Sequence, residues 1–212
     1  MLHLHKPIKK EHIIKYLWII IFSSVLIWSG INPKDQFTWL LEVIPAIITI
    51  IVLAYTYKSF QLTTLVYTLI LIHSIILMVG GHYTYEEVPL FDTLQEIMGS
   101  SRNNYDKVGH FAQGFIPALV VREIILRKNI INGHIWQTIF IVMFCLGFSA
   151  FYELVEWWVA LMTGENAKAF LGTQGYIWDT QSDMAFALLG AFTSLITLTK
   201  LHNKQLANIH IL

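Results

Sequence analysis

Residues 37–55 have the sequence FTWLLEVIPAIITIIVLAY, a run of 19 residues whose only charged side chain is Glu42. An α-helix rises ~1.5 Å per residue, and the hydrocarbon core of a bilayer is ~30 Å thick. About 20 mainly apolar residues are therefore enough to cross it. This stretch predicts a transmembrane helix.

Five further stretches meet the same criterion, and one of them is unusually polar. With Phe37–Tyr55 they are Ile13–Ile31, Leu62–Gly80, Val108–Leu126, Ile135–Leu161 and Met184–Thr199. The stretch Val108–Leu126 contains His110, Gln113, Arg122 and Glu123, which are costly in lipid and should face other helices or an aqueous cavity. We therefore predict an all-α protein with a single domain, residues 1–212, of six transmembrane helices, and a surface helix over Phe91–Met98.

The composition supports a membrane location and excludes several classes of protein. Of the 212 residues, 55% are hydrophobic and 13% are charged, against about 25% charged in a soluble domain. Fourteen Lys+Arg balance fourteen Asp+Glu, which excludes a nucleic-acid binder that relies on a concentrated positive face. The single cysteine, Cys145, excludes an intramolecular disulfide and a Cys-based metal centre. The lipid bilayer is thus the predicted environment.

The distribution of basic residues predicts the orientation. Eight lie at the termini and in the loops of one side, namely Lys6, Lys9, Lys10, Lys58, Arg127, Lys128, Lys200 and Lys204. Four lie on the other side, namely Lys34, Arg102, Lys107 and Lys168. Cytoplasmic loops carry the excess of Lys and Arg. We expect both termini in the cytoplasm, and the long connections 81–107 and 162–183 on the outer side.

Ionisable residues gather at the predicted outer ends of the last spans, in three pairs with helical spacing. The pairs are Asp106 with His110, Glu153 with Glu156, and Asp179 with Asp183. Residues three or four apart share one helix face, so each pair can present two side chains to a common cavity. Helical bundles build metal sites from inward Glu and His side chains at such spacings.

We therefore predict a catalytic site that binds a divalent metal of unknown identity. The predicted ligands are His110, Glu153, Glu156, Asp179 and Asp183. Asp106 is predicted to lie outside the ligand shell, as a general base or as the residue that orients His110. Possible accessory residues are His82, Glu86, Gln113 and Tyr152.

Structural roles for these residues remain open alternatives. Asp106 and Asp179 each precede an apolar stretch and can serve as helix caps. Glu42 is expected to snorkel to the interface. Arg122 and Glu123 are expected to anchor their helix or to contact anionic lipid heads.

Three motifs resemble the YjdF-like family of bacterial multi-pass inner-membrane proteins. They begin at Tyr105 (YDKVGHFAQGFIPALVVREIILR), Phe151 (FYELVEWW) and Phe170 (FLGTQGYIWDTQSDM). The resemblance implies a bacterial inner-membrane location and a fold, but no reaction. A more distant likeness connects Asp106–His110, Glu153–Glu156 and Asp179–Asp183 to VanZ-like membrane proteins, with departures at Glu156 and Asp183.

Three functions follow as hypotheses. The first is a metal-dependent enzyme that acts on an envelope lipid or a cell-wall intermediate, reached from the outer side. The second is an accessory membrane protein, with protein partners unknown, in which the polar cluster is structural. The third is an ion-coupled transporter with Glu153 and Glu156 as protonatable groups, although the polar residues crowd one side of the membrane and no inverted repeat is present.

Overall fold

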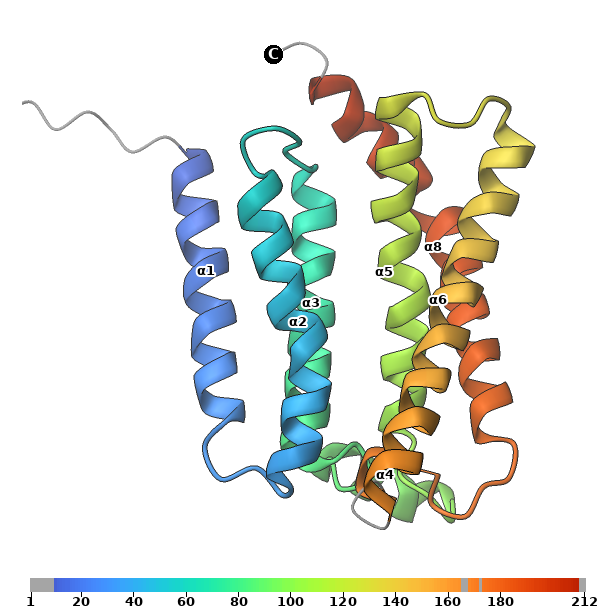
Figure 1. Ribbon diagram of the computed structural model, residues 1–212. Coiled ribbons are helices and arrows are strands. Elements are labelled where there is room, and N and C mark those ends of the chain that lie inside the picture. The colour runs from blue at the N-terminus through green and yellow to red at the C-terminus, as the bar shows by residue number, and fades with distance from the viewer. Residues whose placement is uncertain (1–9, 165–167, 172, 210–212) are drawn as a thin grey trace, which may run out of the picture.

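The computed structural model describes residues 10–164, 168–171 and 173–209, and within these ranges the protein is entirely helical. Figure 1 shows an upright bundle with the short helix α4 across its lower end. The helices are α1 (Lys10–Ser29), α2 (Gln36–Thr56), α3 (Thr64–Tyr83), α4 (Pro89–Met98), α5 (Tyr105–Lys128), α6 (His134–Thr163), α7 (Lys168–Leu171) and α8 (Asp179–Ile209).

The all-α prediction is confirmed, and each predicted span lies on one of these helices. By length and composition α2, α3, α5, α6 and α8 can cross a membrane, whereas the apolar part of α1 is the shorter segment Ile13–Ser29. Six spans, a single domain over 1–212 and cytoplasmic termini therefore remain predictions. The predictions that involve Lys6 and Lys9 fall outside the described residues.

The helix ends follow local rules that the sequence displays. Asp35 caps α2 by accepting the N–H of Thr38 at 2.6 Å, and Thr63 caps α3 in the same way. Short polar side chains are preferred at this position because they satisfy backbone donors that the helix leaves open. At the other end, α4 stops at Gly99, whose φ of +62° is left-handed, the usual backbone of a helix end.

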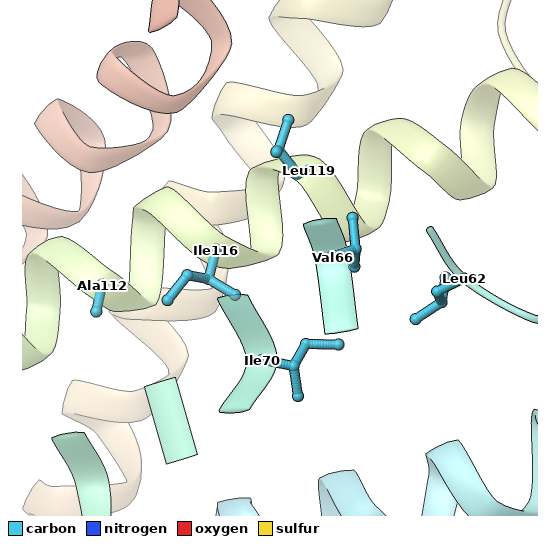
Figure 2. Packing of buried hydrophobic residues seen from close by; sticks show 6 residues of the cluster. All are labelled: Leu62, Val66, Ile70, Ala112, Ile116 and Leu119. Atoms are coloured by element: carbon cyan, nitrogen blue, oxygen red, sulfur yellow. The ribbon is translucent and has the colours of Figure 1, made fainter. Parts of the chain in front are cut away.

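The bundle core between α3 and α5 is apolar. Figure 2 shows this cluster, which consists of Leu62, Val66, Ile70, Ala112, Ile116 and Leu119. Val66 and Leu119 are fully buried. This contact joins the half of the bundle built from α1, α2 and α3 to the half built from α5, α6 and α8.

Helices α5 and α8 run in the same direction and touch backbone to backbone. A Cβ atom placed on Gly114 would overlap the carbonyl group of Ala187, and one placed on Gly190 would overlap the carbonyl group of Phe111. Small residues at such crossings let helices in membranes approach closely. The two glycines therefore set the distance between α5 and α8.

A buried polar cluster joins α3, α5 and α8 at the end away from α4. Glu123 is fully buried and accepts hydrogen bonds from the Thr63 backbone at 3.0 Å and from Arg127 at 2.8 Å. Its Oε2 lies 3.0 Å from Nε2 of His202, whose Nδ1 lies 2.9 Å from Arg122. The expectation that Arg122 and Glu123 serve as interfacial anchors is therefore wrong: they hold three helices together.

Substituting the two glycines should separate α5 from α8. Alanine in place of glycine normally stabilises a helix by roughly 0.5–1 kcal/mol. At Gly114 and Gly190 the clash should reverse the sign, since forcing extra atoms into a filled contact costs about 1–3 kcal/mol. We expect Gly114→Ala and Gly190→Ala to lower the thermal unfolding midpoint in detergent.

Gly147 in α6 provides the matched control, because an added Cβ there meets no atom within 4 Å. Gly147→Ala should leave the midpoint unchanged or raise it. Equal effects at all three glycines would refute the backbone contact.

Candidate functional site

Two basic residues lie among three aspartates at the α4 end of the bundle. Lys107 Nζ lies 2.7 Å from Asp179 Oδ1 and 2.5 Å from Asp183 Oδ1. Arg102 reaches the same Asp179 oxygen at 2.6 Å, and both cations lie 3.4 Å from Asp106 Oδ2. All five side chains are 15% exposed or less. This arrangement is a buried ion-pair network and not a set of helix caps.

His110 lies beside this network and faces carboxylates from three helices. Its Nδ1 is 3.1 Å from Gln113 Oε1. Its Nε2 is 3.3 Å from Asp106 Oδ1, 3.8 Å from Glu153 Oε1 and 3.9 Å from Asp183 Oδ2. An imidazole from α5 is thus surrounded by acids from α5, α6 and α8.

The hydrogen bond to Gln113 determines what Nε2 can do. Because an amide oxygen only accepts hydrogen bonds, Nδ1 carries the proton that it donates to Gln113. In neutral His110 the Nε2 lone pair then points at carboxylate oxygens, a repulsive arrangement. A proton on Nε2 or on one of the facing carboxyl groups would relieve this repulsion, and so would a metal ion bound to Nε2.

The donor atoms fit a metal ion in two overlapping groups. Asp106, His110 and Asp183 offer atoms within 4.8 Å of one another, and so do His110, Glu153 and Glu156. Oε1 of Glu153 is buried and has no hydrogen-bond partner among the described residues. A buried carboxylate oxygen without a partner is costly, and a bound cation would satisfy it. Imidazole with carboxylates suits Mn²⁺, Fe²⁺ or Zn²⁺.

The structure brings together most of the predicted site but exchanges two roles. Asp106, predicted to lie outside the ligand shell, is in a ligand group, whereas Asp179 lies outside both groups. Asp179 instead accepts hydrogen bonds from Arg102 and Lys107.

None of the four predicted accessory residues belongs to a ligand group, and two of them, His82 and Glu86, do not line the adjoining cavity either. Nδ1 of His82 is 2.9 Å from the carbonyl oxygen of Ser29, and its ring centre is 4.7 Å from that of Trp28. Glu86 is half-buried in the turn after α3, where burial and then Glu87 raise its pKa. Gln113 and Tyr152, the other two, do line the site.

Glu42 was expected to snorkel, and that prediction is wrong. Its side chain is buried, with the residue 4% exposed, and its Oε2 accepts a hydrogen bond from the Tyr152 hydroxyl at 3.2 Å. A carboxylate within a transmembrane stretch is a functional candidate by default, so a signal for Glu42 was available. It adds another acid to the same region.

Residues from the loops also contribute to the site. No motif or spacing in the sequence indicates their role. Asn103 is fully buried. Its backbone exchanges hydrogen bonds with the Gln174 side chain at 2.9 and 3.0 Å, and its amide donates to Asp92 at 2.7 Å. These bonds tie α4 and the segment before α8 to the start of α5, which fixes Arg102 next to Asp179.

A cavity of about 580 Å³ opens beside His110. Near His110 the cavity wall includes acidic and aromatic residues from four helices and the turn after α3, namely Glu42, Tyr85, Asp106, Tyr152, Glu156 and Asp183. Pockets of this size with a few convergent polar groups are typical ligand sites. The candidate site is therefore His110, its carboxylates and this adjoining cavity.

The ion-pair network should contribute strongly to stability. Lys107→Met leaves Asp183 without its cation, and breaking a buried pair in this way costs about 3–5 kcal/mol. We expect the free energy of unfolding, measured by denaturant titration in detergent, to fall accordingly. The double variant Lys107→Met/Asp183→Asn should recover part of the loss.

Lys34 provides the control for that measurement. It pairs with Glu87 at 2.7 Å, but the two side chains are 54% and 56% exposed, and exposed pairs contribute little. Lys34→Met should leave the free energy of unfolding nearly unchanged. Equal losses for the two lysines would contradict the buried network.

Comparison with known proteins identifies relatives of the whole membrane region. The family described as "Predicted membrane protein (DUF2238)" matches residues 14–204. The chain is 52% identical over 184 residues to the inner membrane protein YjdF of Escherichia coli (strain K12), which covers 87% of this chain and 88% of that protein. No solved structure matches. The predicted YjdF-like resemblance and membrane location are confirmed, while the likeness to VanZ-like proteins finds no support in these matches.

Proposed function

We propose that this chain, which belongs to the DUF2238 family of predicted membrane proteins, is a metal-dependent enzyme that acts on an envelope lipid or a cell-wall intermediate. The observation that supports this most directly is the placement of His110 Nε2 among Asp106, Glu153 and Asp183 at 3.3–3.9 Å. A metal ion bound to Nε2 would remove the repulsion between a neutral imidazole and these carboxylates, and the surrounding donors are those of a transition-metal site.

Each residue of the site has a distinct task in this proposal. Gln113 holds the ring of His110 so that Nε2 faces the carboxylates, as outer partners of metal-binding histidines do. Asp183 connects two networks, since Oδ1 contacts Lys107 while Oδ2 faces His110. Lys107 thereby fixes the direction of a ligand carboxylate.

The bound metal would polarise an oxygen of the substrate or lower the pKa of a bound water. The protein itself supplies Glu42 and Tyr152, which share a hydrogen bond at 3.2 Å on the cavity wall. Either group could accept or donate a proton if a bound head group came within hydrogen-bond distance of it. We assign the site to the outer side of the membrane on the distribution of Lys and Arg.

Elemental analysis of the purified protein tests the metal site. We expect about one Mn, Fe or Zn ion per chain, since the two ligand groups share His110 and cannot each be complete. His110→Ala and Asp183→Asn should lose the metal, and Gln113→Leu should weaken metal affinity by about 10–100-fold.

His82→Ala is the matched control, because this histidine bonds to Ser29 and lies in neither ligand group. It should retain the metal in full. Folding of each variant is checked by thermal unfolding. A folded wild type without a transition metal, or metal retained in folded His110→Ala, would refute the metal-dependent enzyme.

A structural role in an accessory membrane protein is the second candidate, and the ion pairs of Asp179 favour it. A carboxylate held by Arg102 at 2.6 Å and by Lys107 at 2.7 Å ties two helices together without needing a substrate. In that case Asp179→Asn would lower the thermal unfolding midpoint. The wild-type protein would show no measurable binding of a metal or a lipid. A transporter is less favoured because the middle of α5 packs apolar residues, such as Ile116 and Leu119, into the core.

A further inference from the structure

We propose that the cavity beside His110 is the binding site for one acyl chain of a membrane lipid, whose head group lies at the carboxylate cluster. This inference rests on the proposed function for the head-group site and names its substrate class. One end of the cavity is lined by proposed ligands such as His110 and Asp183, whereas the rest of its wall is formed by residues outside both ligand groups.

The cavity continues as an apolar channel along the helices. Its wall on α2 follows one face of that helix, through Glu42, Pro45, Ile48, Thr49, Val52, Leu53 and Thr56. The wall on α6 is Phe144, Phe148, Tyr152 and Glu156, at intervals of four residues. Such intervals define one helix face, so each helix presents a single continuous stripe to the cavity.

Each stripe changes from polar to apolar in the same direction. The acids Glu42 and Glu156 lie at the α4 end. The wall beyond them is mainly apolar, with side chains such as Ile48, Phe148 and Val120, although it also includes Thr49, His73 and, at the far end, Lys128. The site is therefore amphiphilic along its axis. A head group and a hydrocarbon chain match that order, whereas a small polar metabolite would leave the apolar part empty.

The length of the channel suits an ordinary acyl chain. On α5 the wall has a charged residue at each end, Asp106 and Lys128, and the part between them, from Gly109 to Ile124, is about 22 Å long at ~1.5 Å per residue. A saturated chain with bonds of ~1.5 Å advances about 1.25 Å per carbon, so about 18 carbons fill the channel. This length exceeds the ~15 Å of hydrocarbon in one leaflet, so a bound chain would pass the bilayer midplane.

The channel opens sideways toward the lipid between α2 and α6. Ile48 and Val52 of α2 and Phe144 and Phe148 of α6 line the cavity, yet they remain 54%, 51%, 43% and 42% exposed. Residues that line a cavity and also face the surface form its rim. Helix α2 packs on α3, and among the described helices it does not pack closely on α5 or α6. A chain can therefore enter from the bilayer while a second chain of the same lipid stays outside.

Photolabelling with lipids of two chain lengths tests this proposal. The probes are palmitoyl and octanoyl lysophosphatidylethanolamine, each with a diazirine at the chain end, added to the purified protein in detergent. Labelled residues are mapped by mass spectrometry. We expect the palmitoyl probe to label the far end, at Phe60, Val120 or Ile124, and the octanoyl probe to label the middle, at Leu77, Ile116 or Phe148.

Thr49→Trp and, from the opposite wall, Val120→Phe should block the channel. Either variant should abolish far-end labelling by the palmitoyl probe, and Thr49→Trp should leave labelling by the octanoyl probe in place. The matched control is Ile51→Trp, because Ile51 is 61% exposed on the same helix and does not line the cavity. Folding of all three variants is checked by thermal unfolding.

The proposal would be overturned if labelling were unchanged in both folded blocking variants. It would also be overturned if labelling fell mainly on outward residues such as Ile51 and Ile72. The result of the metal analysis and the result of the photolabelling can be told apart. Far-end labelling in a wild type without metal, or retained in His110→Ala, supports the chain site while leaving the enzyme proposal to its own test. Metal in the wild type with no far-end labelling removes the chain site alone.

Discussion

The backbone contact between α5 and α8 is the constraint on which the site depends. Gly114 and Gly190 allow the two helices to touch, and their parallel course then places the start of α8 beside the start of α5. Asp179 and Asp183 reach Lys107 only because of this proximity. Larger residues at the crossing would move the aspartates away from the lysine by a side chain's width, and a buried charge without its partner is expensive.

Charge is shared across the site instead of being divided into separate pairs. Asp183 uses one oxygen for Lys107 and the other for His110, and Asp106 likewise faces Arg102 and His110. The ion pairs and the proposed ligand set are consequently one network. A structural role and a catalytic role need not compete for these residues, since the pairs that hold the helices also orient the carboxylates.

The sequence predicted what helical periodicity and hydrophobicity determine, and little of what distant loops determine. The pairs Asp106–His110 and Glu153–Glu156 follow from spacing within a helix, and the structure brings both to one place. Asp179 is a predicted ligand because of its spacing from Asp183. Its cation partner Arg102 lies 77 residues away, in a loop without a pattern, so this ion pair could not be predicted. An acid within a transmembrane stretch already marked Glu42 as a functional candidate, but nothing local indicates that its partner Tyr152 lies opposite.

The Glu123 cluster has a consequence for motion in the bundle. Arg122 donates to Nδ1 of His202, so Nε2 of that ring carries the proton and donates to Glu123. Helices α5 and α8 are thus fastened at both ends, by this cluster and by the Lys107 network, and cannot slide past one another without breaking buried bonds. We expect them to act as a rigid wall. An opening toward the bilayer would therefore have to come from α2 or α6 on its two sides, and their movement would then govern how fast molecules from the bilayer exchange with the interior.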